Sequence, residues 1–326
     1  MNKYTKTLAF LILASFITCS FATTTHKHHR RHHKHHSHHT HIGNNASAVS
    51  SAKEASNPAT NSSTPDVINS VAQASVIRHQ PILYSYAALA LDANSGEIFI
   101  SKNPNTRLPI ASITKLMTAM VVLDSGADLD GYVTIADADV DHLRNTFSRL
   151  KVGMQFRRRD LLLVALMSSE NRAAHVLART AYPGGISVFI SKMNAKALSL
   201  GMEHTQFLDP TGLTTANQST ASDLSKMVRA AFNYQLIRQD TTTKGSDFAL
   251  GRRYAHHYIN SDALVRAGKL QIGLSKTGFI NEAGHCLVLY TFVDNDPIIM
   301  VFLNSAGKGG RIMDALTSRR YILSHR

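Results

Sequence analysis

Two serines and two lysines lie in three short strings whose residue types suit acyl transfer. The strings are Ser-Ile-Thr-Lys at Ser112–Lys115, Ser-Glu-Asn at Ser169–Asn171 and Lys-Thr-Gly at Lys276–Gly278. A serine hydroxyl is a weak nucleophile near neutral pH, and a neighbouring lysine can serve as the base that activates it. In this order, the three strings together indicate a hydrolase that forms an acyl-enzyme on a serine.

Each string alone carries little weight, because such short patterns recur by chance. Ser-x-x-Lys also occurs at Ser50–Lys53 and at Ser305–Lys308, and Ser-x-Asn recurs at Ser101–Asn103. Ser112–Lys115, Ser169–Asn171 and Lys276–Gly278 supply all three strings in catalytic order. The functional interpretation therefore depends on the order of the strings.

The first string supplies the nucleophile and its base. The apolar pattern predicts a helix from Ser112 to Leu123, which places Ser112 at the positive end of the helix dipole and Lys115 one turn later on the same face. We expect Lys115 to be the general base, with a pKa lowered by burial and by a second cation, Lys276. Ser169 can pass a proton between this base and the leaving amine.

The other site residues suit substrate binding. Asn171 can hydrogen-bond both a lysine and a substrate amide, while Lys276 and Thr277 suit a substrate carboxylate. Gly278 lies at a strand edge, where the missing side chain lets the backbone approach the acyl group. The amide of Phe279, together with that of the nucleophile, is expected to form the oxyanion hole.

The elements that must position these residues follow a simple order along the chain. Strands are expected at both ends of the folded part, with helices between them. This order predicts an α/β (α+β) fold, in which one mostly antiparallel sheet is built from both ends of the chain and covered by helices. The predicted strands are Tyr84–Leu91, Glu97–Ser101, Gln271–Ser275, Cys286–Val293 and Ile298–Leu303, and the further predicted helices are Arg159–Met167, Asn171–Ala181, Gly185–Leu200, Ser222–Phe232 and Ile312–Leu323.

Residues 1–22 have the features of a signal peptide. A short basic start is followed by an apolar run, Leu8–Ile17, and then by small residues near Ala22. The run is too short to span a bilayer comfortably, so we expect export and cleavage near Ala22. Retention as an uncleaved anchor and lipidation at Cys19 are the weaker alternatives.

Residues 23–80 are expected to be a disordered tail and linker. The segment 26–41 holds ten of the eighteen histidines, and 43–75 is rich in Ser, Ala, Asn and Thr. Clustered imidazoles can bind divalent metals, although their irregular spacing defines no site. A cationic tail can equally adhere to anionic wall or membrane polymers. The remaining residues, 81–326, are expected to form one catalytic domain.

Composition limits the choice of partners. The chain has 326 residues, 44% of them hydrophobic, which is enough for one sizeable core, and its formal net charge is +13. Nucleic acid is not expected as a partner, since an exported chain seldom meets it and no recognition motif is present.

Cleavage would leave Cys286 as the sole cysteine, and its apolar strand indicates a buried, inert thiol.

The sequence around the three strings resembles the low-molecular-weight penicillin-binding proteins, and closely the D-alanyl-D-alanine endopeptidase type of serine peptidase family S11. The match extends over residues 84–326. Its most specific segments are Pro109–Met120, Leu166–Ala174, Tyr182–Gly185, Asp209–Leu213, Lys276–Phe279 and Ala283–Val288.

The resemblance implies a β-lactamase-like transpeptidase fold and a periplasmic enzyme that acts on peptidoglycan. Such an enzyme hydrolyses the D-alanyl to meso-diaminopimelyl cross-links, and β-lactam antibiotics acylate it covalently at the residue matching Ser112. No cofactor and no metal in the catalytic site are expected.

Three other interpretations remain open. Related carboxypeptidases usually continue into a β-rich second domain and an amphipathic anchor, and this chain stops soon after its closing helix, which favours the endopeptidase. A class A β-lactamase would add a Glu-x-x-Leu-Asn string; Glu203 lies in the right stretch but lacks the rest. A metal-binding or wall-binding module with a vestigial site is disfavoured by the intact Ser112, Lys115, Asn171 and Lys276.

Overall fold

The computed structural model describes residues 80–251 and 254–325. The predicted signal peptide at 1–22 and nearly all of the predicted tail at 23–80 lie outside these residues. Within the described part, no helix is long and apolar enough to cross a membrane.

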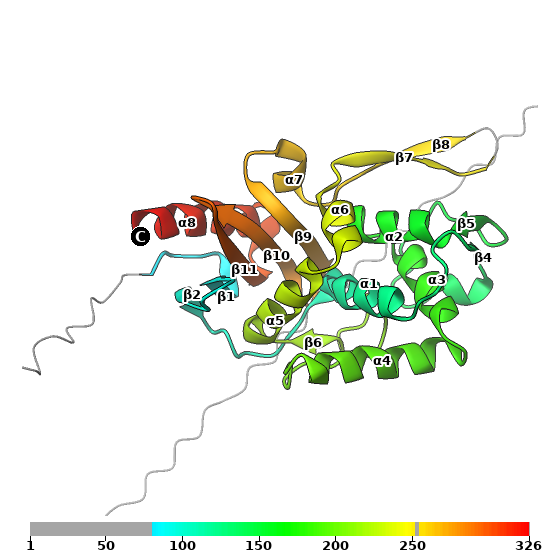
Figure 1. The fold of residues 1–326 in the computed structure, drawn as a ribbon, viewed down its shortest axis with the longest axis horizontal. Helices are drawn as coiled ribbons and strands as arrows, with labels where there is room; N and C mark the ends of the chain where they lie inside the picture. The colour runs from blue at the N-terminus through cyan, green and yellow to red at the C-terminus, as the bar shows by residue number, and fades with distance from the viewer. Residues whose placement is uncertain (1–79, 252–253, 326) are drawn as a thin grey trace, which may run out of the picture. The chain divides into compact units, whose positions relative to one another are not determined.

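A five-stranded antiparallel sheet joins the two ends of the described chain (Figure 1). The strand order is β2-β1-β11-β10-β9, and the N-terminal strand β1 pairs with the last strand β11, for example Leu89 with Val301. This confirms the predicted sheet. The strands are β1 (Ser85–Asp92), β2 (Ile98–Lys102), β9 (Gln271–Ile280), β10 (Gly284–Val293) and β11 (Asp296–Ser305).

Both faces of this sheet are buried, which explains why its inner strands are continuously apolar. In β10, Val288 and Tyr290 face the helical core, while Leu287 and Leu289 face a second core that includes residues of α8 (Gly307–Ser324). Side chains of a strand alternate between its faces, so a strand covered on both sides needs apolar residues at every position.

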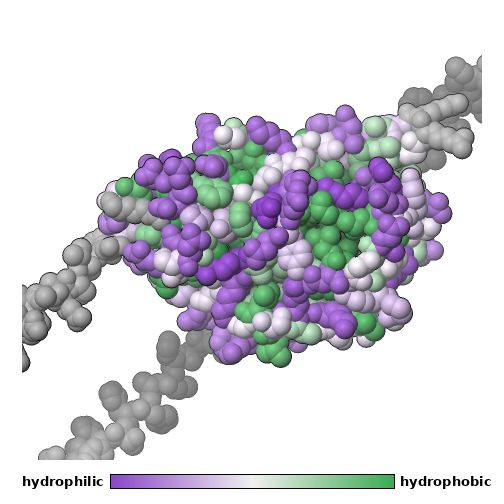
Figure 2. Space-filling view, viewed as in Figure 1, coloured by the Kyte–Doolittle hydropathy of each residue, from purple (hydrophilic) through white to green (hydrophobic). Residues whose placement is uncertain are grey.

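Helices fill the middle of the chain and make up the larger core. Helix α1 is its central element, because every residue from Thr114 to Val122 is buried. Figure 2 shows a mostly hydrophilic face, on which hydrophobic residues gather over the helices in the right half. The helices are α1 (Thr114–Asp124), α2 (Arg158–Met167), α3 (Asn171–Ala181), α4 (Gly185–Ser199), α5 (Ala221–Phe232) and α6 (Gln235–Thr242).

Several short elements were not predicted from the sequence patterns. The most prominent is the hairpin of β7 (Gly245–Ala249) and β8 (Ala255–Ile259), whose Phe248 packs against Phe156 with ring centroids 5.1 Å apart. Such short pieces depend on contacts with distant residues rather than on periodicity. The others are β3 (Leu108–Pro109), β4 (Tyr132–Thr134), β5 (Gln155–Arg157), β6 (Gln218–Ser219), α6, α7 (Ala263–Ala267) and the 3₁₀ turns η1 (Ala111–Ile113) and η2 (Asp137–Asp139).

Two predicted boundaries near the motifs are wrong. The helix predicted to begin at Ser112 begins at Thr114, because Ser112 belongs to η1. The strand predicted to end at Ser275 continues as β9 to Ile280 and so includes the whole Lys-Thr-Gly string. The polar residues and the glycine of this string interrupt the apolar pattern from which strands are predicted. The strand nevertheless pairs with β10 along its full length.

Candidate active site

Ser112 is half-buried in the turn η1, which leads directly into α1. Ala111 has a φ of 47°, a left-handed conformation that residues with a side chain rarely adopt. Thr114 Oγ1 holds this turn by donating to the carbonyl oxygen of Ala111 at 2.8 Å. Ser112 is thus presented at the beginning of α1 on a strained backbone, a feature typical of functional sites.

Two glycines approach this turn from different segments. A Cβ atom on Gly278 would lie 2.8 Å from the carbonyl oxygen of Ile110 and 3.3 Å from the backbone nitrogen of Ser112. Gly212 has a φ of 85°, and a Cβ there would lie 2.0 Å from the carbonyl oxygen of Ala111. Neither position can carry a side chain unless the turn moves.

Lys115 is buried, and its Nζ contacts three oxygen atoms. These are Ser112 Oγ at 2.9 Å, Asn171 Oδ1 at 2.7 Å and the carbonyl oxygen of Thr211 at 2.7 Å. Burial lowers the pKa of Lys115 to about 8, although nearby carboxylates act in the opposite direction. An amine with this pKa becomes neutral near physiological pH, and it can then accept the Ser112 proton.

Lys276 lies in β9 and is also buried. Its Nζ donates to Ser169 Oγ at 3.0 Å and to the carbonyl oxygen of Thr277 at 3.1 Å. Burial holds the pKa of Lys276 well below its ordinary value, and the positive charges of Lys115 and Arg311 lower it further. Of the two causes predicted from the sequence, burial is the main one that lowers the pKa of Lys115.

The second string turns the chain from α2 into α3. Ser169 has a φ of 65°. Glu170 caps α3, its carboxylate accepting a hydrogen bond from the backbone nitrogen of Arg172 at 3.3 Å. Asn171 is the first residue of α3 and donates from Nδ2 to Thr146 Oγ1 at 3.1 Å. Because Nδ2 carries two hydrogens, one remains for a substrate carbonyl.

The backbone of β9 beside Gly278 runs close to η1. Gly278 pairs with Cys286 of β10, and Arg311 Nη1 donates to the carbonyl oxygens of both at 3.0 Å, so both carbonyls lie between the two strands. Alternation along β9 then turns the N–H of Phe279 toward the free edge, which runs beside η1. This N–H therefore lies on the same edge of β9 as the close approach of Gly278 to the Ser112 backbone nitrogen.

Comparison with known proteins identifies the family. The model of peptidase family S11, described as D-alanyl-D-alanine carboxypeptidase, matches residues 74–307. The chain belongs to this family. It is therefore a serine hydrolase, and the resemblance drawn from the motifs is confirmed.

Two curated relatives of this S11 peptidase are named D-alanyl-D-alanine endopeptidase. The protein from Pseudomonas aeruginosa is 46% identical over 250 residues, which are 74% of this chain and 78% of the relative. The protein from Escherichia coli K12 is 44% identical over 245 residues, with the same coverage. Relatives named carboxypeptidase are more distant, for example DacB2 of Mycobacterium tuberculosis at 31% over 226 residues, covering 68% of this chain and 70% of the relative.

Solved structures confirm the predicted fold class. The DD-transpeptidase of Streptomyces K15 is 29% identical, has a TM-score of 0.70, and covers 75% of this chain and 99% of its own. A D-alanyl-D-alanine carboxypeptidase of Mycobacterium tuberculosis is 28% identical with a TM-score of 0.69, covering 76% and 94%.

The sequence interpretation gave no role to three residues that hold this S11 site together. Ser261 accepts a hydrogen bond from Thr277 Oγ1 at 2.8 Å. Arg311 is buried behind β9, where it contacts the Gly278 carbonyl. Thr211 contacts Lys115 through its carbonyl oxygen. A backbone carbonyl leaves no signal in side-chain patterns, and the other two residues lie in segments that the motifs do not include.

The Thr211 carbonyl is held in place by an acid from the same loop. Asp209 Oδ1 accepts from the backbone nitrogens of Thr211 and Gly212, the latter at 2.7 Å, and Oδ2 accepts from the nitrogen of Thr214 at 3.0 Å. Aspartate, proline and glycine in this order are typical of such a turn. The matched segment Asp209–Leu213 was thus noted from the sequence, but its structural role was not.

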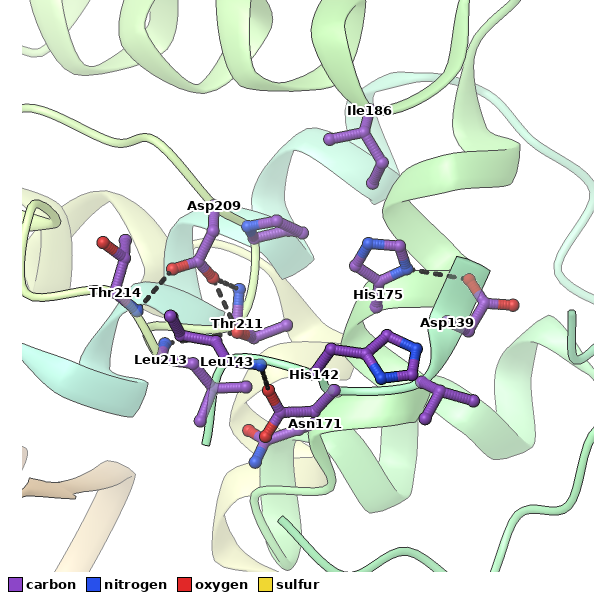
Figure 3. Close-up of a pocket in the computed structure, with 13 residues that line it drawn as sticks. Asp139, His142, Leu143, Asn171, His175, Ile186, Asp209, Thr211, Leu213 and Thr214 are labelled. Atoms are coloured by element: carbon purple, nitrogen blue, oxygen red, sulfur yellow. Dashed lines mark hydrogen bonds and ion pairs between the residues drawn. The ribbon is translucent and has the colours of Figure 1, made fainter. Parts of the chain in front are cut away.

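A cavity of about 230 Å³ adjoins Asn171 on the side of this loop (Figure 3). His142 and His175 face it, and His175 Nδ1 lies 2.8 Å from Asp139 Oδ1. Burial raises the pKa of Asp139, but hydrogen bonds from Arg179 and His175 outweigh this effect and bring the pKa to about 2. The carboxylate therefore stays ionised as a fixed partner of both residues.

A second cavity, of about 490 Å³, opens on the other side of the second string. Ser169 and Asn171 line it, and Asn260 and Ser261 lie across from them. Among the described residues, no cluster of His, Cys, Asp and Glu could hold a metal ion. Cys286 is buried, and burial raises the pKa of its thiol to about 11, as expected for an unreactive cysteine.

Proposed function

We propose that this S11 peptidase is a D-alanyl-D-alanine endopeptidase that hydrolyses the D-alanyl to meso-diaminopimelyl cross-links of peptidoglycan. The contact of 2.9 Å between Lys115 Nζ and Ser112 Oγ carries the catalytic part of the proposal. The substrate specificity is supported by the names of the two relatives with identities above 40%.

The proposed reaction begins with neutral Lys115, which takes the proton of Ser112 as Oγ attacks the D-alanyl carbonyl carbon. The amides of Ser112 and Phe279 hold the oxyanion that forms. Protonated Lys115 then gives its proton through Ser169 to the leaving amine and becomes neutral again, and Lys276, which donates to Ser169 Oγ at 3.0 Å, fixes that hydroxyl. The C–N bond then breaks and leaves an ester on Ser112.

Water hydrolyses this ester in the second half of the reaction. Lys115 takes a proton from the water, the ester bond breaks, and Ser112 recovers its proton. β-Lactams follow the first half only, because their opened ring stays attached to the acyl group. Ser112 is therefore the residue we propose to be acylated by penicillins.

A D-alanyl-D-alanine carboxypeptidase is the second candidate, because the family description and the more distant relatives carry that name. A β-lactamase is less well supported. Glu203 is exposed in a turn, and Asp209, whose charge raises the pKa of Lys115, accepts hydrogen bonds from its own loop through both oxygens. The Asp209 carboxylate is thus engaged by its own loop, and Glu203 lacks the rest of the Glu-x-x-Leu-Asn string.

We also propose that the protein is exported to the periplasm, with cleavage near Ala22, on the strength of the basic start and apolar run. For the His-rich segment 26–41 we propose binding to anionic wall polymers, supported by its cationic composition, with divalent metal binding as the alternative. Deletion of 23–75 should lower retention on cell-wall sacculi at low salt and leave penicillin labelling intact.

Purified muropeptides test the activity directly. The wild-type protein should convert cross-linked dimers into monomers, as followed by chromatography, and a fluorescent penicillin should label it. Ser112→Ala should lose both activities. Release of terminal D-alanine from pentapeptides without loss of dimers would favour the carboxypeptidase instead.

A further inference from the structure

The cavity of about 490 Å³ adjoins the hydroxyl group that serves the leaving amine in the proposed mechanism. Ser169 lines it directly, and so does Ser261, the partner of Thr277. Since Ser169 must stand within hydrogen-bond reach of the leaving nitrogen, whatever is attached to that nitrogen extends into this cavity.

The cavity is large for a single amino acid. Sites that enclose ligands of drug size measure roughly 300–1,000 Å³, and this cavity lies within that range. A carboxypeptidase releases only free D-alanine, which would leave most of the space unfilled. An endopeptidase releases a whole stem peptide, whose size suits the cavity.

Three cations from three separate segments line this space. Arg149 precedes β5, Arg266 belongs to α7, and Lys308 stands in the first turn of α8. Arg266 and Lys308 are exposed, and no salt bridge within the described residues engages any of the three. Lys308 ends the Ser305–Lys308 string, which follows the Lys-Thr-Gly string and is therefore out of catalytic order.

Glu170 is the acidic residue among the described lining residues, and its carboxylate already accepts a hydrogen bond. Glu170 caps α3, and burial raises the pKa of its carboxyl. Of the four described Lys, Arg, Asp and Glu side chains that line the cavity, three are therefore cations. A stem peptide with diaminopimelate carries several carboxylates, and free D-alanine carries one, so three dispersed cations match the peptide better.

The hairpin of β7 and β8 forms part of the cavity wall. Its aromatic residues contact one another and a phenylalanine far away in the sequence. Tyr258 is buried, and its ring lies 5.6 Å from that of Phe248, which itself packs on Phe156. At the rim, Ile259 and Phe147 are exposed, and the Arg149 guanidinium stacks over the Phe147 ring at 5.2 Å. The wall thus combines apolar surface with fixed positive charge, which suits an acidic peptide.

We propose that this cavity is the subsite for the leaving strand, which binds the acidic stem peptide through Arg149, Arg266 and Lys308. The inference rests on the proposed endopeptidase activity. As the amide C–N bond breaks, the new amine takes its proton through Ser169, and the carboxylates of the released peptide stay paired with the three cations until it dissociates. The subsite thereby favours cross-linked substrates over pentapeptides.

Charge-neutral variants test the subsite. Arg266→Gln and Lys308→Gln should each lower kcat/KM for a purified cross-linked muropeptide dimer about tenfold, mainly through KM, because each removes one charge pair. Labelling by fluorescent penicillin, which releases no peptide, should stay within about twofold of wild type. Arg320→Gln removes a cation from the other end of α8 and should leave both rates unchanged.

The outcomes distinguish failure of the subsite from failure of the proposed function. If the wild type cleaves dimers and both variants do so at the wild-type rate, the subsite is refuted while the endopeptidase stands. An equal slowing of penicillin labelling in the variants would also refute it, because the charges would then act on Ser112 itself. If the wild type releases D-alanine but never cleaves dimers, the proposed function fails instead.

Discussion

Gly278 of β9 and Ser112 of η1 stand so close that a methyl group on Gly278 would lie 3.3 Å from the Ser112 backbone nitrogen and 2.8 Å from the carbonyl oxygen of Ile110. The third motif therefore fixes the position of the first through backbone contact. The two segments therefore meet backbone to backbone, next to the Ser112 and Phe279 amides that the proposed mechanism uses.

Substitution of Gly278 by alanine should separate these two segments. The added Cβ forces β9 or η1 to shift, and we expect the rate of penicillin acylation to fall by about tenfold or more, with a loss of about 1–3 kcal/mol in stability. Stopped-flow acylation and thermal unfolding measure the two effects. Gly309→Ala is the matched control, since its Cβ would meet nothing within 4 Å; equal behaviour of both variants would contradict the prediction.

The pH dependence of acylation should report Lys115. Its pKa is about 8, lowered by burial, and the neutral amine is the active base, so kcat/KM should rise with pH and level off above about 8. The charge of Glu170 raises this pKa. Glu170→Gln should therefore move the acid limb to lower pH. An unchanged or upward-shifted limb in this variant would argue against Lys115 as the titrating base.

Arg311 should act as a positioning residue for the oxyanion hole. Its Nη1 holds the Gly278 carbonyl at 3.0 Å, and because the peptide unit is planar, this contact also orients the N–H of Phe279. Arg311→Met should slow acylation about tenfold to a hundredfold with little change in the initial binding of penicillin. Partial recovery in Arg311→Lys would support positioning, whereas a loss confined to initial binding would contradict it.

The ion pair between Arg159 and Asp240 should matter for stability rather than catalysis. It joins α2 to α6 through two contacts of 2.8 and 2.7 Å, and the Asp240 side chain is 1% exposed. Arg159→Ala leaves a buried carboxylate without its partner and should cost about 3 kcal/mol, measured by chemical unfolding. Arg157→Ala breaks an exposed pair with Asp160 and should leave the midpoint unchanged.

The motif order and the apolar patterns were sufficient for the family, the sheet and most of the long helices. The continuous apolar run of β10 indicates a strand buried on both faces, and α3 repeats its apolar residues at helical spacing. These signals lie within single segments, so sequence reasoning can detect them. The short hairpin of β7 and β8 has no such internal signal, because its stability comes from contacts made by Phe248 and Tyr258.

The sequence by itself determined which residues are chemically able to form an acyl-enzyme. Residue type and order are sufficient to identify Ser112, Lys115, Ser169, Asn171 and Lys276. Only the tertiary structure decided how they are tuned. The Thr211 carbonyl, 96 residues from Lys115, and Ser169, 107 residues from Lys276, become neighbours only when the chain folds. Burial, which sets the pKa of both lysines, is likewise a property of packing, because it depends on every segment that excludes water from the site.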